Sequence, residues 1–309
     1  MATIGDMFGG ADAATFLGVP ARRLDQLAPG MLAIMGVPTA TPYASAGAYC
    51  AGGPAAMRKA IAPYSASRHH MDFDLGHPIE GGRPIVDLGD LPWDAVDHAA
   101  NRDRIRAAVG QSLAAGAVPV ILGGDDSVPI PVLEAYKNRG PINILQIDAH
   151  IDWRDEVGGE RWGLSSTMRR ASEMGMVKDI LQVGQRAIGS ARPADFDDAK
   201  RGGARFIPAS QVHRFGIEAV LGQLPKDHPL FINLDVDALD PAIMPAVIGP
   251  APGGLTYAQV TELLHRAAAG GPIAGFAILE LMPDRDADGL SALTAARLVC
   301  NILGLLSRA

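Results

Sequence analysis

The sequence has few of the features that mark secreted, membrane-spanning or nucleic-acid-binding proteins. Only two of its 309 residues are cysteines, Cys50 and Cys300, so we interpret both as small buried hydrophobic residues in a reducing cytoplasm. Residues 1–20 contain no basic segment before an apolar stretch, so we expect no signal peptide and a cytoplasmic location. No run of about 18 apolar residues occurs, which argues against a membrane span. The net charge is -7 and no long basic run exists, which argues against a nucleic-acid partner.

The remaining composition is typical of a globular enzyme, with 48% hydrophobic and 20% charged residues. Short apolar strands alternate with segments of helical periodicity along the chain. We predict strands at 31–37, 84–88, 118–122, 143–147, 180–183, 205–207, from 230 onward and at 273–279. The predicted helices are 54–62, 94–115, 129–136, 165–174, 193–200, 215–224, 256–268 and 290–306.

The predicted strands are almost entirely apolar, which is typical of parallel sheets that helices cover on both faces. We therefore predict an α/β fold with an eight-stranded parallel sheet. No change of composition divides the chain, so we expect a single domain over residues 1–309. Residues 1–29 are mixed in composition and are predicted to form an irregular N-terminal arm with a short helix.

Acidic side chains follow two of the predicted strands at the point where each strand ends. Asp148, His150 and Asp152 alternate with apolar residues after strand 143–147, so an extended backbone turns all three to one face. Asp235 and Asp237 repeat this spacing after the strand that begins at Leu230. Buried carboxylates without partners cost several kcal/mol each, so a shared cation is the simplest explanation for two acidic strand ends.

Two further strands contribute acids to the same edge of the predicted sheet. Strand 118–122 runs into Gly123-Gly-Asp-Asp-Ser127, and Glu280 follows strand 273–279. The glycine segment lacks the lysine and the spacing of a phosphate-binding loop, and Ser127 is expected to cap the next helix. In parallel sheets, ligands gather beyond the carboxyl ends of the strands. Carboxylate oxygens with few imidazoles favour Mn²⁺ or Mg²⁺ over zinc.

At these motifs the sequence resembles the ureohydrolase family, which contains arginases, agmatinases and guanidino-acid hydrolases. The resemblance extends from Gly36-Val-Pro to the last helix. It includes Gly123-Gly-Asp-Asp-Ser, Asp148-Ala-His-Ile-Asp, Asp235-Val-Asp-Ala-Leu-Asp-Pro241 and Gly253-Gly-Leu. It implies an arginase-like three-layer sandwich that holds two divalent metal ions per subunit, Mn²⁺ or in some members Ni²⁺. In the family, a hydroxide that bridges the two ions attacks a guanidinium carbon and releases urea or an amine.

The resemblance also implies a role for each candidate residue. Asp148 and Asp235 correspond to carboxylates that bridge both metal ions. Asp152 would complete one metal site, and His150 with Asp237 would complete the other. Glu280 matches the acid that holds the guanidinium group of the substrate, so Asp148 and Glu280 are the predicted catalytic residues.

The sequence departs from the family pattern at three places. Asp126 replaces the usual histidine ligand, and a further carboxylate should weaken the Lewis acidity of the metal pair. Leu164 stands where a catalytic histidine is expected. The loop Ala242–Pro250 is more apolar than its family counterpart. We predict that Met244, Val247 and Ile248 of this loop line the substrate path, which argues against an α-amino-acid substrate such as arginine.

Two functions remain open on this basis. The first is a metal-dependent amidinohydrolase, similar to agmatinase, that cleaves a C–N bond of a small or N-substituted guanidine or amidine. The second is a catalytically weak or inactive ureohydrolase-like subunit that stabilises an active paralogue. The resemblance implies a homo-oligomer, either a trimer or a hexamer, and the second function implies a hetero-oligomer. A serine nucleophile is not supported, because no Gly-x-Ser-x-Gly elbow is present.

Overall fold

An eight-stranded parallel sheet runs through the part of the chain that the computed structural model describes, residues 4–8 and 13–309. Its strand order is β2-β1-β3-β8-β7-β4-β5-β6, and each neighbouring pair is parallel. The strands are β1 (Leu32–Val37), β2 (Ile85–Asp90), β3 (Val118–Gly123), β4 (Ile142–Ile147), β5 (Val177–Val183), β6 (Arg205–Ile207), β7 (Leu230–Asp235) and β8 (Ile273–Leu279). The predicted α/β fold is confirmed.

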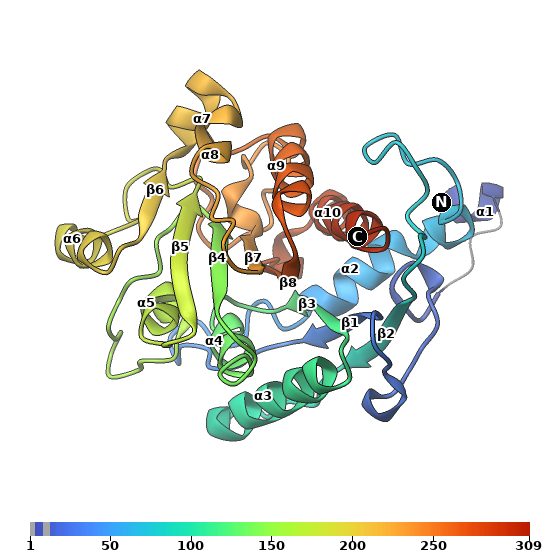
Figure 1. Cartoon of the computed structure of the whole chain (residues 1–309), viewed down its shortest axis with the longest axis horizontal. Helices are drawn as coiled ribbons and strands as arrows, with labels where there is room; N and C mark the ends of the chain where they lie inside the picture. Colours follow the sequence, from blue (N-terminus) through green and yellow to red (C-terminus); the bar gives the residue numbers. More distant parts are fainter. Residues whose placement is uncertain (1–3, 9–12) are drawn as a thin grey trace.

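Helices cover both faces of the sheet and make a three-layer sandwich (Figure 1). One face carries α2 (Gly53–Ile61), α9 (Tyr257–Gly270) and α10 (Leu290–Leu306), and the other carries α3 (His98–Ala114), α4 (Pro129–Glu134) and α5 (Thr167–Ser172). The residues of β1, β4 and β7 are buried throughout. Covering both faces removes this apolar surface from water, which explains why these strands have no polar alternation.

The other helices are short. They are α1 (Ile4–Phe8), α6 (Pro193–Arg201), α7 (Ala209–Phe215) and α8 (Glu218–Leu221), with short 3-10 helices at Phe16–Gly18, Leu24–Gln26, Ala62–Ser67, Leu164–Ser166, Val236–Ala238 and Pro283–Arg285. Of these, α6 and α7 lie near the β6 edge of the sheet in Figure 1. Within the described ranges, no helix has the length and hydropathy of a membrane-spanning segment. Cys50 and Cys300 are both free and buried, as predicted.

Some predicted helices have different limits in the structure. The helix predicted at 215–224 is shorter in the structure, where α8 covers Glu218–Leu221. Helix α7 before it was not predicted, and Gly216, with a φ of 72°, separates the two. The predicted capping role of Ser127 is also wrong. Its hydroxyl donates to Asp125 and accepts the backbone N–H of Thr41, so it stabilises the loop between β3 and α4.

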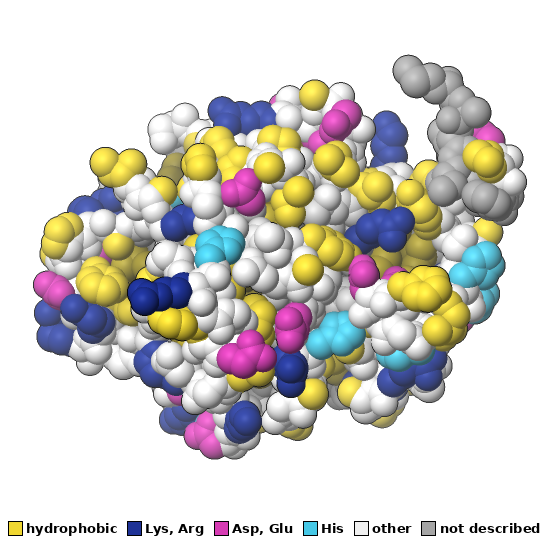
Figure 2. Space-filling model, turned by 90° about the horizontal axis from the view of Figure 1, so that it is seen from above, with side chains coloured by type: hydrophobic (Ala, Val, Ile, Leu, Met, Phe, Trp, Pro, Cys, Tyr) yellow, Lys and Arg dark blue, Asp and Glu magenta, His cyan; other side chains and the backbone are white. Residues whose placement is uncertain are grey.

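Residues 13–29 of the predicted N-terminal arm pack against the core. Phe16, Leu17 and Val19 are buried in the same apolar cluster as residues of α2 and α10. The backbone N–H of Phe16 donates to Asp87 Oδ2 on β2 at 2.7 Å. On the face of the molecule in Figure 2, basic and acidic side chains are interspersed in small groups.

Candidate metal centre

The acidic strand ends meet at one edge of the sheet because their strands are neighbours. The four strands β3, β8, β7 and β4 lie next to one another in that order, and all point the same way. Their carboxyl ends surround a cavity of about 230 Å³. Seven of the predicted site residues line it: Asp126, His150, Asp152, Asp235, Asp237, Ile248 and Glu280. Asp148 is fully buried among them.

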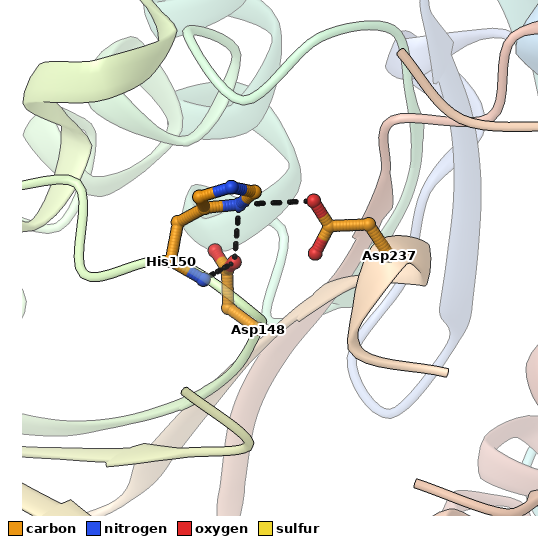
Figure 3. A group of neighbouring side chains, drawn as sticks. All are labelled: Asp148, His150 and Asp237. Carbon is orange, nitrogen blue, oxygen red and sulfur yellow. Dashed lines mark hydrogen bonds and ion pairs between the residues drawn. The ribbon is translucent and has the colours of Figure 1, made fainter. Parts of the chain in front are cut away.

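The first group of potential ligands contains Asp148, His150 and Asp237 (Figure 3). His150 Nδ1 lies 3.0 Å from Asp237 Oδ2 and 3.5 Å from Asp148 Oδ1. The backbone N–H of His150 also donates to Asp148 Oδ1 at 2.5 Å. Two loops that lie 85 residues or more apart in the chain therefore direct an imidazole and two carboxylates to one point.

The second group contains Asp126, Asp148 and Asp152. One carboxylate oxygen of each residue lies within 4.8 Å of the others, and all three side chains are buried. Asp152 has a φ of 45°, a conformation that L-residues rarely adopt outside functional sites. Asp126 Oδ1 accepts a hydrogen bond from Asn233, but Asp126 Oδ2 is buried and has no hydrogen-bond partner among the described residues.

The carboxylates of this site carry more negative charge than the protein itself neutralises. Burial, and then the Asp148 carboxylate, holds the pKa of Asp126 well above its usual range. Burial and Asp237 do the same to the pKa of Asp235. Burial alone would lower the pKa of His150, but its bonds to Asp148 and Asp237 raise it to about 11. A bound cation would lower the pKa of each acid and so favour its ionised form. The side chains around these acids supply too little positive charge to do this.

The two groups fit a pair of hard divalent ions. They share Asp148, so ions held by both groups would be neighbours, and the donors are carboxylate oxygens with one imidazole. The Oδ2 atom of Asp126 is the clearest indication of a metal ligand. Burying an oxygen without a hydrogen-bond partner costs about 1–3 kcal/mol of folding free energy, and a bound cation would remove that cost. Asp235 lines the cavity, and its Oδ1 accepts the backbone N–H of Asp237 at 2.7 Å.

Glu280 lies beside these groups and is held by residues from two other loops. The hydroxyl of Tyr49 donates to Glu280 Oε1 at 2.9 Å and to Oε2 at 2.7 Å, and the backbone N–H of Asp126 donates to Oε1 at 2.8 Å. Glu280 has a φ of 68°, so the backbone is strained where the side chain turns into the cavity. Sequence reasoning missed Tyr49, since 231 residues separate it from Glu280.

The predicted substrate-path residues do not lie together. Ile248 lines the cavity and is 43% exposed. Met244 and Val247 are instead buried in the core, so the prediction that they line the path is corrected. Both are apolar side chains on a loop, and burial against α9 and the sheet removes them from water.

Leu164, which the sequence placed where a catalytic histidine is expected, lines the cavity. Arg154 and Asp195 also line it and were not predicted. Arg192 binds both oxygens of Asp195, at 2.6 and 2.7 Å, whereas Arg154 Nε lies 3.4 Å from the same carboxylate. The terminal nitrogens of Arg154 have no partner among the described residues, so this side chain brings free N–H donors to the cavity wall. A single arginine in a charged loop gives no signal in the sequence that it faces a site.

Comparison with known proteins gives consistent results. Residues 31–304 match the model of the arginase family. The chain is 35% identical over 221 residues to N(1)-aminopropylagmatine ureohydrolase from Thermus thermophilus, covering 70% of this chain and 71% of that protein. It is 32% identical over 244 residues to the mitochondrial guanidino acid hydrolase of Homo sapiens, covering 75% and 68%. A hypothetical agmatinase from Burkholderia thailandensis has a similar structure, with a TM-score of 0.81, 25% identity, and coverage of 96% and 91%.

Proposed function

Because the chain belongs to the arginase family, we propose that it is a binuclear metal hydrolase for small or N-substituted guanidines or amidines. The reaction would cleave a C–N bond and release urea or an amine. One observation carries this proposal: two groups of potential ligands share Asp148, and Asp126 brings an unpaired buried oxygen to one of them. Mn²⁺ is the expected metal, and Ni²⁺ is the second choice.

Each part of the site has a distinct task in this proposal. Asp126, Asp148 and Asp152 would hold one ion, and Asp148, His150 and Asp237 the other, with Asp235 between them. Divalent ions bound here would acidify a water molecule and neutralise the negative charge that develops during its attack on the guanidinium carbon.

Glu280 faces the same cavity and would accept N–H groups of the substrate's guanidinium, which a carboxylate binds through charge-assisted hydrogen bonds. Leu164 has no titratable group, so proton transfer to the leaving amine would fall to the carboxylates around the cavity.

The cavity walls support a small substrate. A volume of about 230 Å³ leaves little space beside two ions and a guanidinium group. Ile248 presents an apolar surface to this space. An apolar wall discriminates an added methylene by only about 1–3 kcal/mol, so short N-alkyl substituents are compatible with it. Ile248 and Gly249 are the residues of the loop Ala242–Pro250 that line the cavity, and neither side chain can bind an α-amino group. Both oxygens of Asp195, another acid of the lining, are bound by Arg192. We therefore expect guanidino compounds without an α-amino group to be better substrates than arginine.

Two measurements test the proposal. Elemental analysis of protein purified with Mn²⁺ or Ni²⁺ should find close to two ions per chain. An assay of urea and amine release should then find methylguanidine, dimethylguanidine or guanidinobutyrate hydrolysed better than arginine, with agmatine as a cationic reference. Protein without metal under both conditions would contradict the enzyme function. A preference for arginine would contradict the interpretation of the loop Ala242–Pro250.

The second candidate is a weakly active subunit that stabilises a paralogue. Two features favour it. Asp126 in place of a histidine should weaken the Lewis acidity of the metal pair. Leu164 places a side chain without a titratable group in the cavity. The two candidates differ in assembly. We expect the enzyme to form a homo-oligomer, a trimer or hexamer, by light scattering. The subunit would instead gain activity only after mixing with its paralogue.

A further inference from the structure

Three side-chain amides lie in one row beneath the acidic edge of the sheet. Gln182 on β5, Gln146 on β4 and Asn233 on β7 are register partners on neighbouring strands, so their side chains share one face. All three are 0% exposed. We call these three residues the amide row. Their neighbours in the same register are apolar, Ala277 on β8 and then Ile121 on β3.

The direction of the amides follows from chemistry. Gln146 Nε2 donates to Asp148 Oδ2 at 2.6 Å and to Asp152 Oδ2 at 2.8 Å. Ionised carboxylates only accept hydrogen bonds, so the nitrogen of Gln146 must face them. Its oxygen then accepts from Gln182 Nε2, which also donates to the backbone oxygen of Ile151 at 2.9 Å.

Asn233 serves the third acid of the same group. Its Nδ2 donates to Asp126 Oδ1 at 3.1 Å. This bond leaves Asp126 Oδ2 as the oxygen without a partner. The amide row therefore contacts each carboxylate of the group Asp126, Asp148 and Asp152.

Strand packing does not explain the amide row. Ala277 and Ile121 show that apolar side chains fit this layer of the sheet, and burying an amide is favourable only when its hydrogen bonds are made. The side-chain oxygens of Gln182 and Asn233 have no hydrogen-bond partner in residues 4–8 and 13–309, whereas each side-chain nitrogen of the row donates at least once. The row thus supplies donors, and most of them point to the acids.

We propose that the amide row positions Asp126, Asp148 and Asp152 for metal binding. Each donated N–H fixes the position of one carboxylate oxygen, and Asp126 keeps its second oxygen available for a cation. Neutral donors also stabilise three neighbouring like charges without adding a positive charge that would compete with the ion. This role rests on the proposed function, since it requires that metal ions bind at this site.

The test measures Mn²⁺ affinity in metal-free protein by calorimetric titration. Gln146→Met and Asn233→Leu keep side-chain volume but remove the donors. We expect each to weaken Mn²⁺ binding about 10–100-fold, the usual effect of losing a group that orients a ligand. Asn143→Leu is the matched control. Asn143 is a fully buried amide on the same strand as Gln146, but it donates to Asp227 at the opposite end. Its replacement should leave Mn²⁺ affinity unchanged.

A double variant separates positioning from general disruption. Within the described part of the chain, the side chain of Asn233 hydrogen-bonds to the site only through Asp126. Asn233→Leu should therefore cause no further loss of affinity in an Asp126→Ala protein. If Asn233→Leu fails to fold, Asn233→Ala removes the donor with a smaller side chain, and the same loss is expected.

Equal Mn²⁺ affinity in the original protein and in the row variants would overturn this role alone. Losses that add in the double variant would overturn it too. Absence of Mn²⁺ binding by the original protein would overturn both this role and the proposed function.

Discussion

Replacing Asp126 by alanine gives the most direct test of the metal centre. Asp126 is only 2% exposed, and it is the residue at which the sequence departs from the histidine of its family. Asn233 occupies one oxygen of its carboxylate, and the other oxygen has no partner. Asp126→Ala therefore removes one of three potential ligands from its group and one negative charge from a buried cluster.

The structure predicts two effects of opposite sign. Loss of an orienting residue alone weakens metal binding about 10–100-fold, so loss of a ligand should exceed about 100-fold, or roughly 2.8 kcal/mol. In metal-free protein the same change should increase stability at pH 8. Burial and Asp148 raise the pKa of Asp126, so its carboxylate opposes folding once the pH exceeds the unfolded pKa of about 4. A buried ion costs several kcal/mol, which exceeds the roughly 1 kcal/mol of its hydrogen bond to Asn233.

Both effects are measurable on the same samples. Elemental analysis and calorimetric titration give the number of ions and their affinity, and urea denaturation with EDTA gives the metal-free stability. Asp126→His should retain metal and move the pH–rate profile to lower pH, because a neutral ligand leaves the ions more acidifying. If Asp126→Ala bound metal with unchanged number and affinity, Asp126 would not be a ligand and the two-effect argument would fail.

Three further predictions concern the binding of the substrate's guanidinium group, the binding of a substrate carboxylate, and the pH dependence of stability. Glu280→Gln should lower kcat/KM about 10–100-fold with metal content unchanged, because one charge-assisted pair is lost; an unaltered kcat/KM would exclude Glu280 from substrate binding. Arg154→Ala should lower kcat/KM for guanidinobutyrate about tenfold but leave kcat/KM for methylguanidine unchanged. Guanidinobutyrate has a carboxylate that can accept the N–H groups of Arg154, whereas methylguanidine has none. Equal losses for both substrates would contradict this. The pKa of Asp235 is raised in the folded protein, so the folded metal-free protein holds more protons than the unfolded chain between about pH 4 and that raised pKa. Its Tm should therefore fall as the pH rises through this window. With Mn²⁺ the Tm should rise over the same window, because ligands must lose protons to bind; parallel curves would contradict the metal site.

The sequence predicted which strand ends carry the acids of the site. The predicted extended backbone is wrong, because the chain bends at residues 149–150 and Asp152 has a φ of 45°. Asp237 likewise lies in a 3-10 helix and not in an extended segment. Parallel strands end at one edge, so these segments had to meet there once the sheet was predicted.

Contacts between distant segments were beyond such reasoning. Tyr49 reaches Glu280 from a loop 231 residues away, and no pattern in either segment indicates the other. Met244 and Val247 were placed on the substrate path because they are apolar residues in a site loop, but the loop buries them in the core. Gln146 has the spacing of a buried strand residue, and only the register with Gln182 shows that it belongs to a row.

The choice between enzyme and supporting subunit depends on what the buried acids do for the protein. In the absence of cations, burial raises the pKa of Asp126, Asp152 and Asp235, so the folded state at neutral pH is less stable than one with apolar residues there. A subunit that only supports a partner gains nothing from this arrangement or from three amides that stabilise it. Metal binding would explain both the buried acids and the amide row. Bound ions would remove the repulsion among the carboxylates, and the second oxygen of Asp126 would bind one of them. A protein whose stability does not change on addition of Mn²⁺ or Ni²⁺ would remove that reason and favour the supporting subunit.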